Sequence, residues 1–97
     1  MTVYALAQLR IHDRESYNRY QARFMPVLQK YNGRLLAADE SPRVLEGEWW
    51  DRNKVVLMEF ADKDAFRAWA TSPEYTEIAQ DRKAGADAVV LLITGFG

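Results

Sequence analysis

Two glutamates interrupt apolar segments of the chain and are the first candidates for chemistry. Glu46 and Glu59 both lie in segments that predict buried strands, where an unpaired carboxylate is costly. If residues 50–53 form the turn of a hairpin, Glu46 faces Leu57 and Glu59 faces Val44, about 7–8 Å apart on one face. Two close carboxylates raise each other's pKa, which would supply a general acid or base. The alternative is a structural ion pair of Glu59 with one of three arginines: Arg34, Arg43 or Arg82.

A phenol and a guanidinium form the second candidate pair. Tyr75 and Arg82 are seven residues apart in a predicted helix, so they lie on the same helical face. Both could point into a cleft between helix and sheet and hold an anionic ligand. The alternative is a core aromatic residue at Tyr75 and a buried glutamate paired with Arg82.

The single histidine, His12, follows the first predicted strand beside Asp13. A lone imidazole next to a carboxylate could act as a base, although a solvated histidine beside a helix cap is the simpler interpretation. With one histidine and no cysteine, the chain offers poor ligands for zinc or haem. We therefore expect no metal and no cofactor.

Three tryptophans could stack a flat organic substrate. Trp69 is at helical spacing from Phe66 and is expected in the core. Trp49 and Trp50 flank the predicted hairpin turn and are expected to contact a partner at the rim of a dimer, pointing to opposite faces.

The elements that must position these residues follow from periodicity and capping. Residues 3–11 alternate with period two, which predicts a strand. Asp13 caps a long amphipathic helix that ends at Asn32 and Gly33, with a kink or break expected near Pro26. A second helix begins after Asp62, begins again at Ser72 and Pro73, and ends at Gly85. Residues 34–39 and 43–49 are predicted as strand segments separated by a turn. Residues 54–60 and 87–94 are the remaining predicted strands. The order predicts one α+β domain over residues 1–97, with a four-stranded antiparallel sheet and helices on one face.

Both faces of that sheet read as apolar. Tyr4 and Leu6 lie opposite the alanines of the first strand, and residues 88–93 are apolar throughout. Because helices on one side cover only one face, we expect a second copy to cover the other in a homodimer with sheet-to-sheet packing. The alternative is a monomer in which these residues cap a small internal cluster.

Composition excludes several classes of partner. Thirteen basic and fourteen acidic residues give a formal charge of -1, so nucleic acid is not expected. The longest apolar run, six residues, is far shorter than the roughly 20 that span a bilayer. The lack of an export signal pattern and of cysteine predicts a cytoplasmic protein.

Several short motifs resemble one bacterial family. They are Leu-Glu-Gly at 45–47, Glu-Phe at 59–60, and Ser-Pro-Glu-Tyr at 72–75 followed by Arg82. In this order they resemble domain of unknown function 1330, a family of the dimeric alpha-beta barrel superfamily. The resemblance implies a ferredoxin-like βαββαβ monomer whose sheet packs on that of a partner, and it implies no activity. Relatives in the superfamily include cofactor-free monooxygenases and isomerases, so the fold does not choose a function.

Three functions remain open. The first is binding of a small organic molecule, with an anion as one option, in a cleft between helices and sheet. The second is a cofactor-free monooxygenase or isomerase, and the third is a structural or interaction module without a ligand. The candidate ligand-binding residues are Glu46, Glu59, Tyr75, Arg82, Arg34 and His12.

Overall fold

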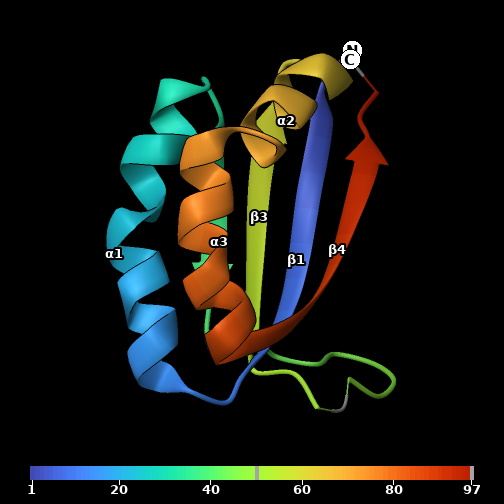
Figure 1. Ribbon diagram of the computed structural model, residues 1–97. Coiled ribbons are helices and arrows are strands. Elements are labelled where there is room, and N and C mark those ends of the chain that lie inside the picture. The colour runs from blue at the N-terminus through green and yellow to red at the C-terminus, as the bar shows by residue number, and fades with distance from the viewer. Residues whose placement is uncertain (50, 97) are drawn as a thin grey trace.

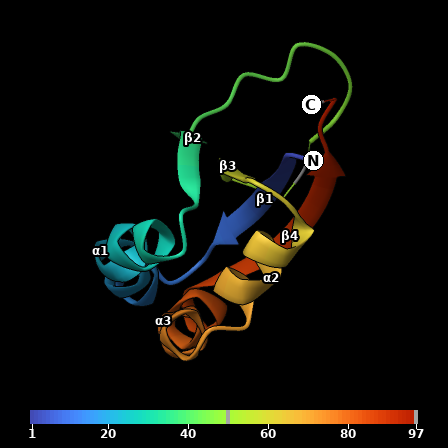
Figure 2. The ribbon, with the colours of Figure 1, turned by 90° about the horizontal axis from the view of Figure 1, so that it is seen from above.

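A computed structural model describes residues 1–49 and 51–96 of the chain. Four antiparallel strands form one sheet in the order β2-β3-β1-β4. All helices lie on one face of this sheet, and both chain ends lie at the same end of it (Figures 1 and 2). The strands are β1 (Val3–Ile11), β2 (Arg34–Asp39), β3 (Lys54–Phe60) and β4 (Ala86–Thr94). The helices are α1 (Arg14–Lys30), α2 (Lys63–Ala70) and α3 (Pro73–Gly85). The expected α+β ferredoxin-like arrangement is confirmed.

Each helix begins at a side chain that caps its first turn. Asp13 accepts a hydrogen bond from the Ser16 amide, and Asp62 accepts one from the Ala65 amide. Ser72 does the same for Tyr75, and Pro73 follows it at the start of α3, where a missing N–H has no cost. α1 continues from Arg14 to Lys30 with Pro26 inside it, so a break near Met25 is wrong, whereas a kink there stays a prediction.

The alternation of β1 and β3 divides the sheet into two faces. Val3, Ala5, Ala7 and Leu9 are buried beneath the helices, while the residues between them are only half-buried. β3 alternates in the same way, so β1 and β3 together form the floor of the core. Aromatic side chains from α1, α2 and α3 pack on this floor: Tyr17, Tyr20, Phe24, Phe66, Trp69 and Tyr75.

The strand expected over residues 43–49 is wrong. Residues 40–49 and 51–53 form a long loop that projects beyond the end of the sheet, on the side away from the helices (Figures 1 and 2). β2 pairs with β3 directly, with Arg34 opposite Glu59, and β1 occupies the other edge of β3. Both edges of β3 are therefore paired, so β3 is not free to form the expected hairpin with residues 43–49.

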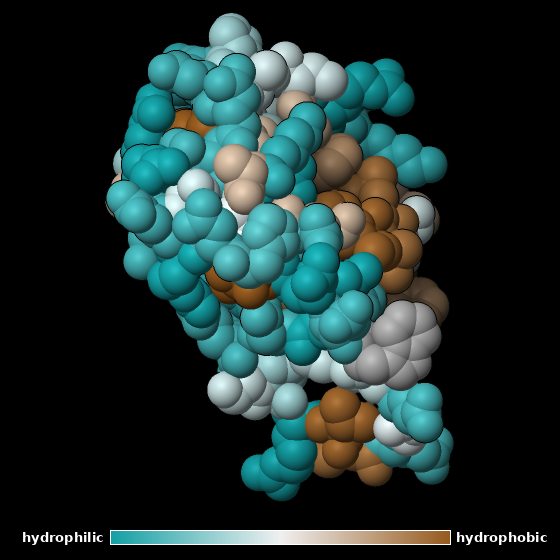
Figure 3. All heavy atoms as spheres, turned by 60° about the horizontal axis from the view of Figure 1, so that its bottom comes forward, coloured by the Kyte–Doolittle hydropathy of each residue, from teal (hydrophilic) through white to brown (hydrophobic). Residues whose placement is uncertain are grey.

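The face of the sheet without helices, here named the open face, carries a central apolar row. Leu57 of β3, Leu6 of β1 and Leu91 of β4 lie side by side in the register. β4 is exposed at all five apolar residues 89–93, and Figure 3 shows apolar surface at the right of the molecule, the side on which β4 lies in Figure 1. Within the described residues, no helix is long and apolar enough to cross a membrane.

Candidate functional site

A cavity of about 580 Å³ lies between the helices and the covered face of the sheet. Every strand and helix contributes to its wall, which is mainly apolar and aromatic. Met25 of α1 and Leu35 of β2 are exposed residues at its edge. Its size is in the usual range for a site that binds a small molecule. The aromatic and long apolar residues in the wall are Tyr17, Tyr20, Phe24, Met58, Phe66, Trp69 and Tyr75.

The charged groups of the cavity are all cationic. Lys54, Arg82 and Lys83 line it, and none of the lining residues in the described chain is an aspartate or glutamate. Positive charge in an apolar wall is costly unless something of opposite charge compensates it. The cavity is therefore electrostatically suited to a negatively charged group.

Lys54 is the most buried of these cations, with 5% of its surface exposed. It begins β3 on the helix side, where its Nζ donates to Gln21 Oε1 at 3.0 Å and lies 4.8 Å from the centre of the Tyr17 ring. Burial lowers the pKa of Lys54, and the nearby Glu40 opposes this shift. The Glu40 carboxylate is 3.9 Å from Nζ, which is too far for a hydrogen bond.

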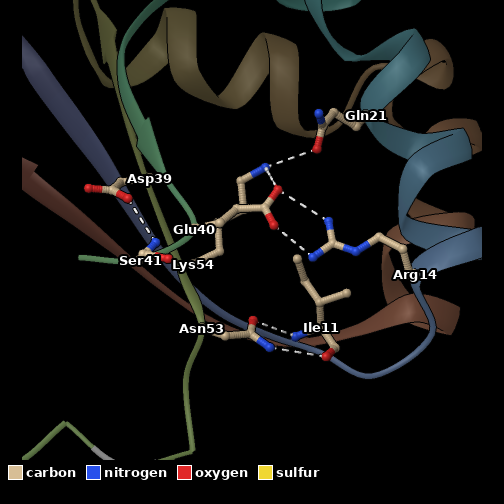
Figure 4. A network of polar contacts seen from close by, with 8 residues as sticks. All are labelled: Ile11, Arg14, Gln21, Asp39, Glu40, Ser41, Asn53 and Lys54. Atoms are coloured by element: carbon tan, nitrogen blue, oxygen red, sulfur yellow. Dashed lines mark hydrogen bonds and ion pairs between the residues drawn. The ribbon is translucent and has the colours of Figure 1, made fainter.

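Glu40 is hydrogen-bonded to Arg14 and not to Lys54. Arg14 donates to both of its carboxylate oxygens, at 2.7 and 3.1 Å (Figure 4). This pairing lowers the pKa of Glu40 and holds the carboxylate beside the lysine instead of on it. Lys54 thus keeps donor capacity for a ligand.

Two further donors at the cavity have no partner. Arg82 Nε and Trp69 Nε1 are buried, and neither atom has a hydrogen-bond acceptor in the described part of the chain. Leaving a buried N–H group unpaired costs about 1–3 kcal/mol. Both residues line the cavity, so hydrogen-bonding capacity that the described chain does not use lies close to it.

A pair of tyrosine hydroxyls lies on the same wall. The Tyr20 and Tyr75 oxygens are 3.1 Å apart, which links α1 to α3. Burial raises the pKa of Tyr20 well above its ordinary value and raises that of Tyr17 to about 12. Tyr17 and Tyr20 therefore stay neutral at physiological pH and can act as donors or acceptors.

The predicted pair of Tyr75 and Arg82 is brought together at this cavity, from one face of α3. The alternative partner for Arg82, a buried glutamate, is not found among residues 1–49 and 51–96. Trp69 is in the core, as expected, and also lines the cavity.

The other candidate residues lie elsewhere. Glu59 is on the open face, where Arg34 donates to its Oε1 at 3.1 Å, so the structural ion pair is confirmed. Glu46 lies exposed in the loop of residues 40–53, so the expected placement of Glu46 and Glu59 on one hairpin face is wrong. His12 is exposed after β1, with Nε2 3.7 Å from Asp87. The described residues contain no group of three or more His, Cys, Asp or Glu suited to a metal ion.

Two tryptophans remain from the sequence predictions. Trp49 is half-buried, and its Nε1 donates to Gln8 Oε1 at 2.8 Å, across the open face. Trp50 lies outside the described residues. A contact of either residue with a partner stays a prediction.

Lys54 is the most buried charged residue of the cavity wall, and sequence reasoning missed it. It shares the period of two with Val56, Met58 and Phe60, all on the covered face of β3. A lysine in phase with three buried apolar residues is itself a signal of a buried cation. The hairpin turn expected at residues 50–53 puts Lys54 directly after the turn, which hid this signal.

Comparisons with known proteins agree with the observed fold. A protein of unknown function from Rhodopseudomonas palustris is similar in structure, with a TM-score of 0.78, 22% identity, and coverage of 99% of this chain and 83% of that one. A dimeric ferredoxin-like protein of unknown function from Jannaschia sp. CCS1 has a TM-score of 0.73 and 20% identity, with coverage of 98% and 100%. SnoaB from Streptomyces nogalater, described as a cofactor-independent oxygenase, has a TM-score of 0.73 and 18% identity, with coverage of 99% and 94%. No curated protein matches the chain.

These likenesses establish the fold, and their identities are too low to carry a function. The sequence profile of one family, described as domain of unknown function DUF1330, matches residues 2–96. This match covers nearly the whole chain and includes the Ser-Pro-Glu-Tyr segment and Arg82. The chain therefore belongs to the DUF1330 family.

Proposed function

We propose that this protein binds a small organic anion in the cavity between its helices and its sheet. The observation that carries the proposal is the charge of the cavity wall, with three cations, two unpaired buried N–H groups and no lining carboxylate among the described residues. A structural role alone would favour donors that are matched within the protein, because an unmatched buried donor lowers stability.

The position of each group indicates how an anion would be held. Arg82 presents a planar guanidinium suited to two oxygens of a carboxylate, and Lys54 supplies a second charge from the sheet. Trp69 and Tyr75 have ring centres 4.0 Å apart and form part of an aromatic wall. A ligand with a flat apolar body and one carboxylate matches this combination of wall and donors.

The open face supports a homodimer built by sheet-to-sheet packing. The row of Leu57, Leu6 and Leu91 is covered by none of the helices α1 to α3 of the described residues, and a second copy of the same row is self-complementary. Similar structures from Jannaschia and Bacteroides fragilis are described as dimeric. We expect the ligand and the partner to occupy opposite faces of one sheet.

The ligand proposal is tested by a thermal-shift screen of matched acids and amides. Benzoate, naphthoate and aliphatic carboxylates are compared with the amide of each acid, which has the same shape without the charge. We expect at least one carboxylate to raise the melting temperature and its amide to fail. If no carboxylate stabilises the protein, or if the amides stabilise it equally, the anion proposal is wrong.

Variants then assign the effect to the cavity. Arg82→Met keeps much of the apolar stem and should abolish stabilisation by the carboxylate at little cost in stability. Arg67→Met, at an exposed arginine of α2 that does not line the cavity, is the matched control and should bind normally. A purely structural Arg82 predicts the reverse, namely a large fall in melting temperature in Arg82→Met and no ligand effect in the wild type.

A further inference from the structure

The loop after β2 contains a segment, residues 41–49, that we name the arm. Figures 1 and 2 show the arm extending past the end of the sheet on the side away from the helices. Its last residue, Trp49, donates from Nε1 to Gln8 on the open face. The arm therefore lies beside the surface on which the second copy is proposed to sit.

The base of the arm is held firmly in place. The Ser41 amide donates to Asp39 Oδ1 at 2.8 Å, next to the paired carboxylate of Glu40 (Figure 4). After the arm, the Asn53 side chain accepts from the Ile11 amide at 2.9 Å and donates to the Ile11 carbonyl at 3.2 Å. These bonds fix the direction in which the arm leaves the sheet.

The tip of the arm is apolar and does not fold back on its own chain. Val44 is 48% exposed and Leu45 is 86% exposed. Gly47 has a φ of +85°, and a Cβ at this position would meet no atom within 4 Å. Figure 3 shows apolar atoms at the lower end of the molecule, set apart from the body. Adjacent exposed apolar side chains on a projecting segment indicate an interaction site.

We propose that the arm packs against the second copy of the chain, so that Val44 and Leu45 are buried across the dimer. The proposal rests on the proposed homodimer, because a second sheet seated on the open face would lie beside the projecting arm. In a two-fold symmetric dimer each copy gives one arm and receives one, so the two contacts form together. The occupant is a second copy because the arm is continuous with the open face.

The test uses a single thiol, because the chain contains no cysteine. In the Leu45→Cys variant, the rate of maleimide labelling is measured while sedimentation velocity reports the oligomeric state of the same sample. We expect labelling to be at least about tenfold slower in the dimer than after dilution to monomer, since only the opened form exposes the thiol. Asn18→Cys, at an exposed position of α1, should label at the same fast rate in both states.

The outcomes separate the arm from the dimer itself. If the sample sediments as a dimer and Leu45→Cys labels as fast as Asn18→Cys, the arm proposal is wrong and the dimer stands. A sample that is monomeric at every concentration overturns both. Leu45→Asp gives an independent readout, because it should shift the dimer toward monomer while carboxylate binding persists in the cavity.

Discussion

The covered face and the open face of the sheet are both apolar, but they differ in whether the polar groups beside them have partners. On the open face Glu59 is paired with Arg34. On the covered face Arg82 Nε and Trp69 Nε1 are buried without a partner in the described chain. Polar groups that are paired with each other among apolar side chains are typical of a surface that packs on another protein. Hydrogen-bond donors without a partner around a cavity are typical of a ligand site. The two faces of one sheet thus indicate two different roles.

The largest difference between the two faces is expected when the same charge is placed on neighbouring residues of β1. Ala5 is 0% exposed beneath the helices, so Ala5→Asp should cost on the order of 3–5 kcal/mol, the scale of an unpaired buried charge, and should unfold the chain. Leu6 faces the other way, between Leu57 and Leu91, so Leu6→Asp should give a folded monomer. Circular dichroism and sedimentation velocity distinguish the results, and equal unfolding of both variants would contradict the separation of the faces.

A smaller effect is expected from Glu74, at the start of α3. Lys30 and the Tyr31 hydroxyl donate to its carboxylate and lower its pKa from 4.5 to about 2. Because the folded pKa is the lower one, the stabilisation is complete above about pH 4.5 and is lost as the pH falls towards about 2.

Glu74→Gln should therefore melt at a lower temperature than the wild type at neutral pH, and the gap should close as the pH falls through this window. Melting curves at several pH values check this result. A gap that stays constant down to the lowest pH would show that the carboxylate charge is not the cause. This helix contact should not alter the oligomeric state, which keeps it separate from the effects on the open face.

The smallest effect is expected at the exposed pair of Arg14 and Glu40. About half of the Arg14 side chain is exposed, so Arg14→Ala should lower stability by less than about 1 kcal/mol. Urea denaturation measures this difference. Freed from Arg14, Glu40 would be able to approach Lys54 and compete with a ligand, so weaker carboxylate binding is also expected. A large loss of stability would show that this pair, and not the core, holds the loop base.

Much of the fold could be predicted from the sequence, because local chemistry determines it. The caps at Asp13, Asp62 and Ser72 and the alternation of β1 are each visible within a few residues. The apolar character of the open face could also be predicted, from the residues that lie opposite the alanines of β1. The break expected near Pro26 did not occur, and α1 has buried core residues on both sides of the proline, Phe24 before it and Leu28 after it.

The strand order around β3 could not be predicted in the same way. Residues 43–49 resemble a strand in composition, but a strand forms only where a neighbouring strand has a free edge. The edge of β3 that they were expected to share is paired with β2. The positive φ angle of Gly47, within the expected strand, is compatible with a loop and not with a regular strand ladder. The acid pair of Glu46 and Glu59 depended on this register, so it failed with the strand.

The candidate site was only partly visible for a related reason. The spacing of Tyr75 and Arg82 on one helix is a local property and was sufficient to place both at one wall. Trp69 was expected only as core, and its unpaired Nε1 depends on the arrangement of several elements. Lys54 was visible in the alternation of β3 and was hidden by the assumed hairpin.

The central claim is that ligand and partner bind on opposite faces of the sheet. Native mass spectrometry tests it most directly, because one spectrum shows both the oligomeric state and the bound ligand. With a carboxylate that stabilises the protein, the account predicts a species of twice the 11.2 kDa chain mass carrying bound ligand. Arg82→Met should then remain a dimer without ligand, and Leu6→Asp should become a monomer that still binds it. A wild-type monomer without ligand, or an Arg82→Met variant that loses the dimer together with the ligand, would contradict the assignment of ligand and partner to opposite faces.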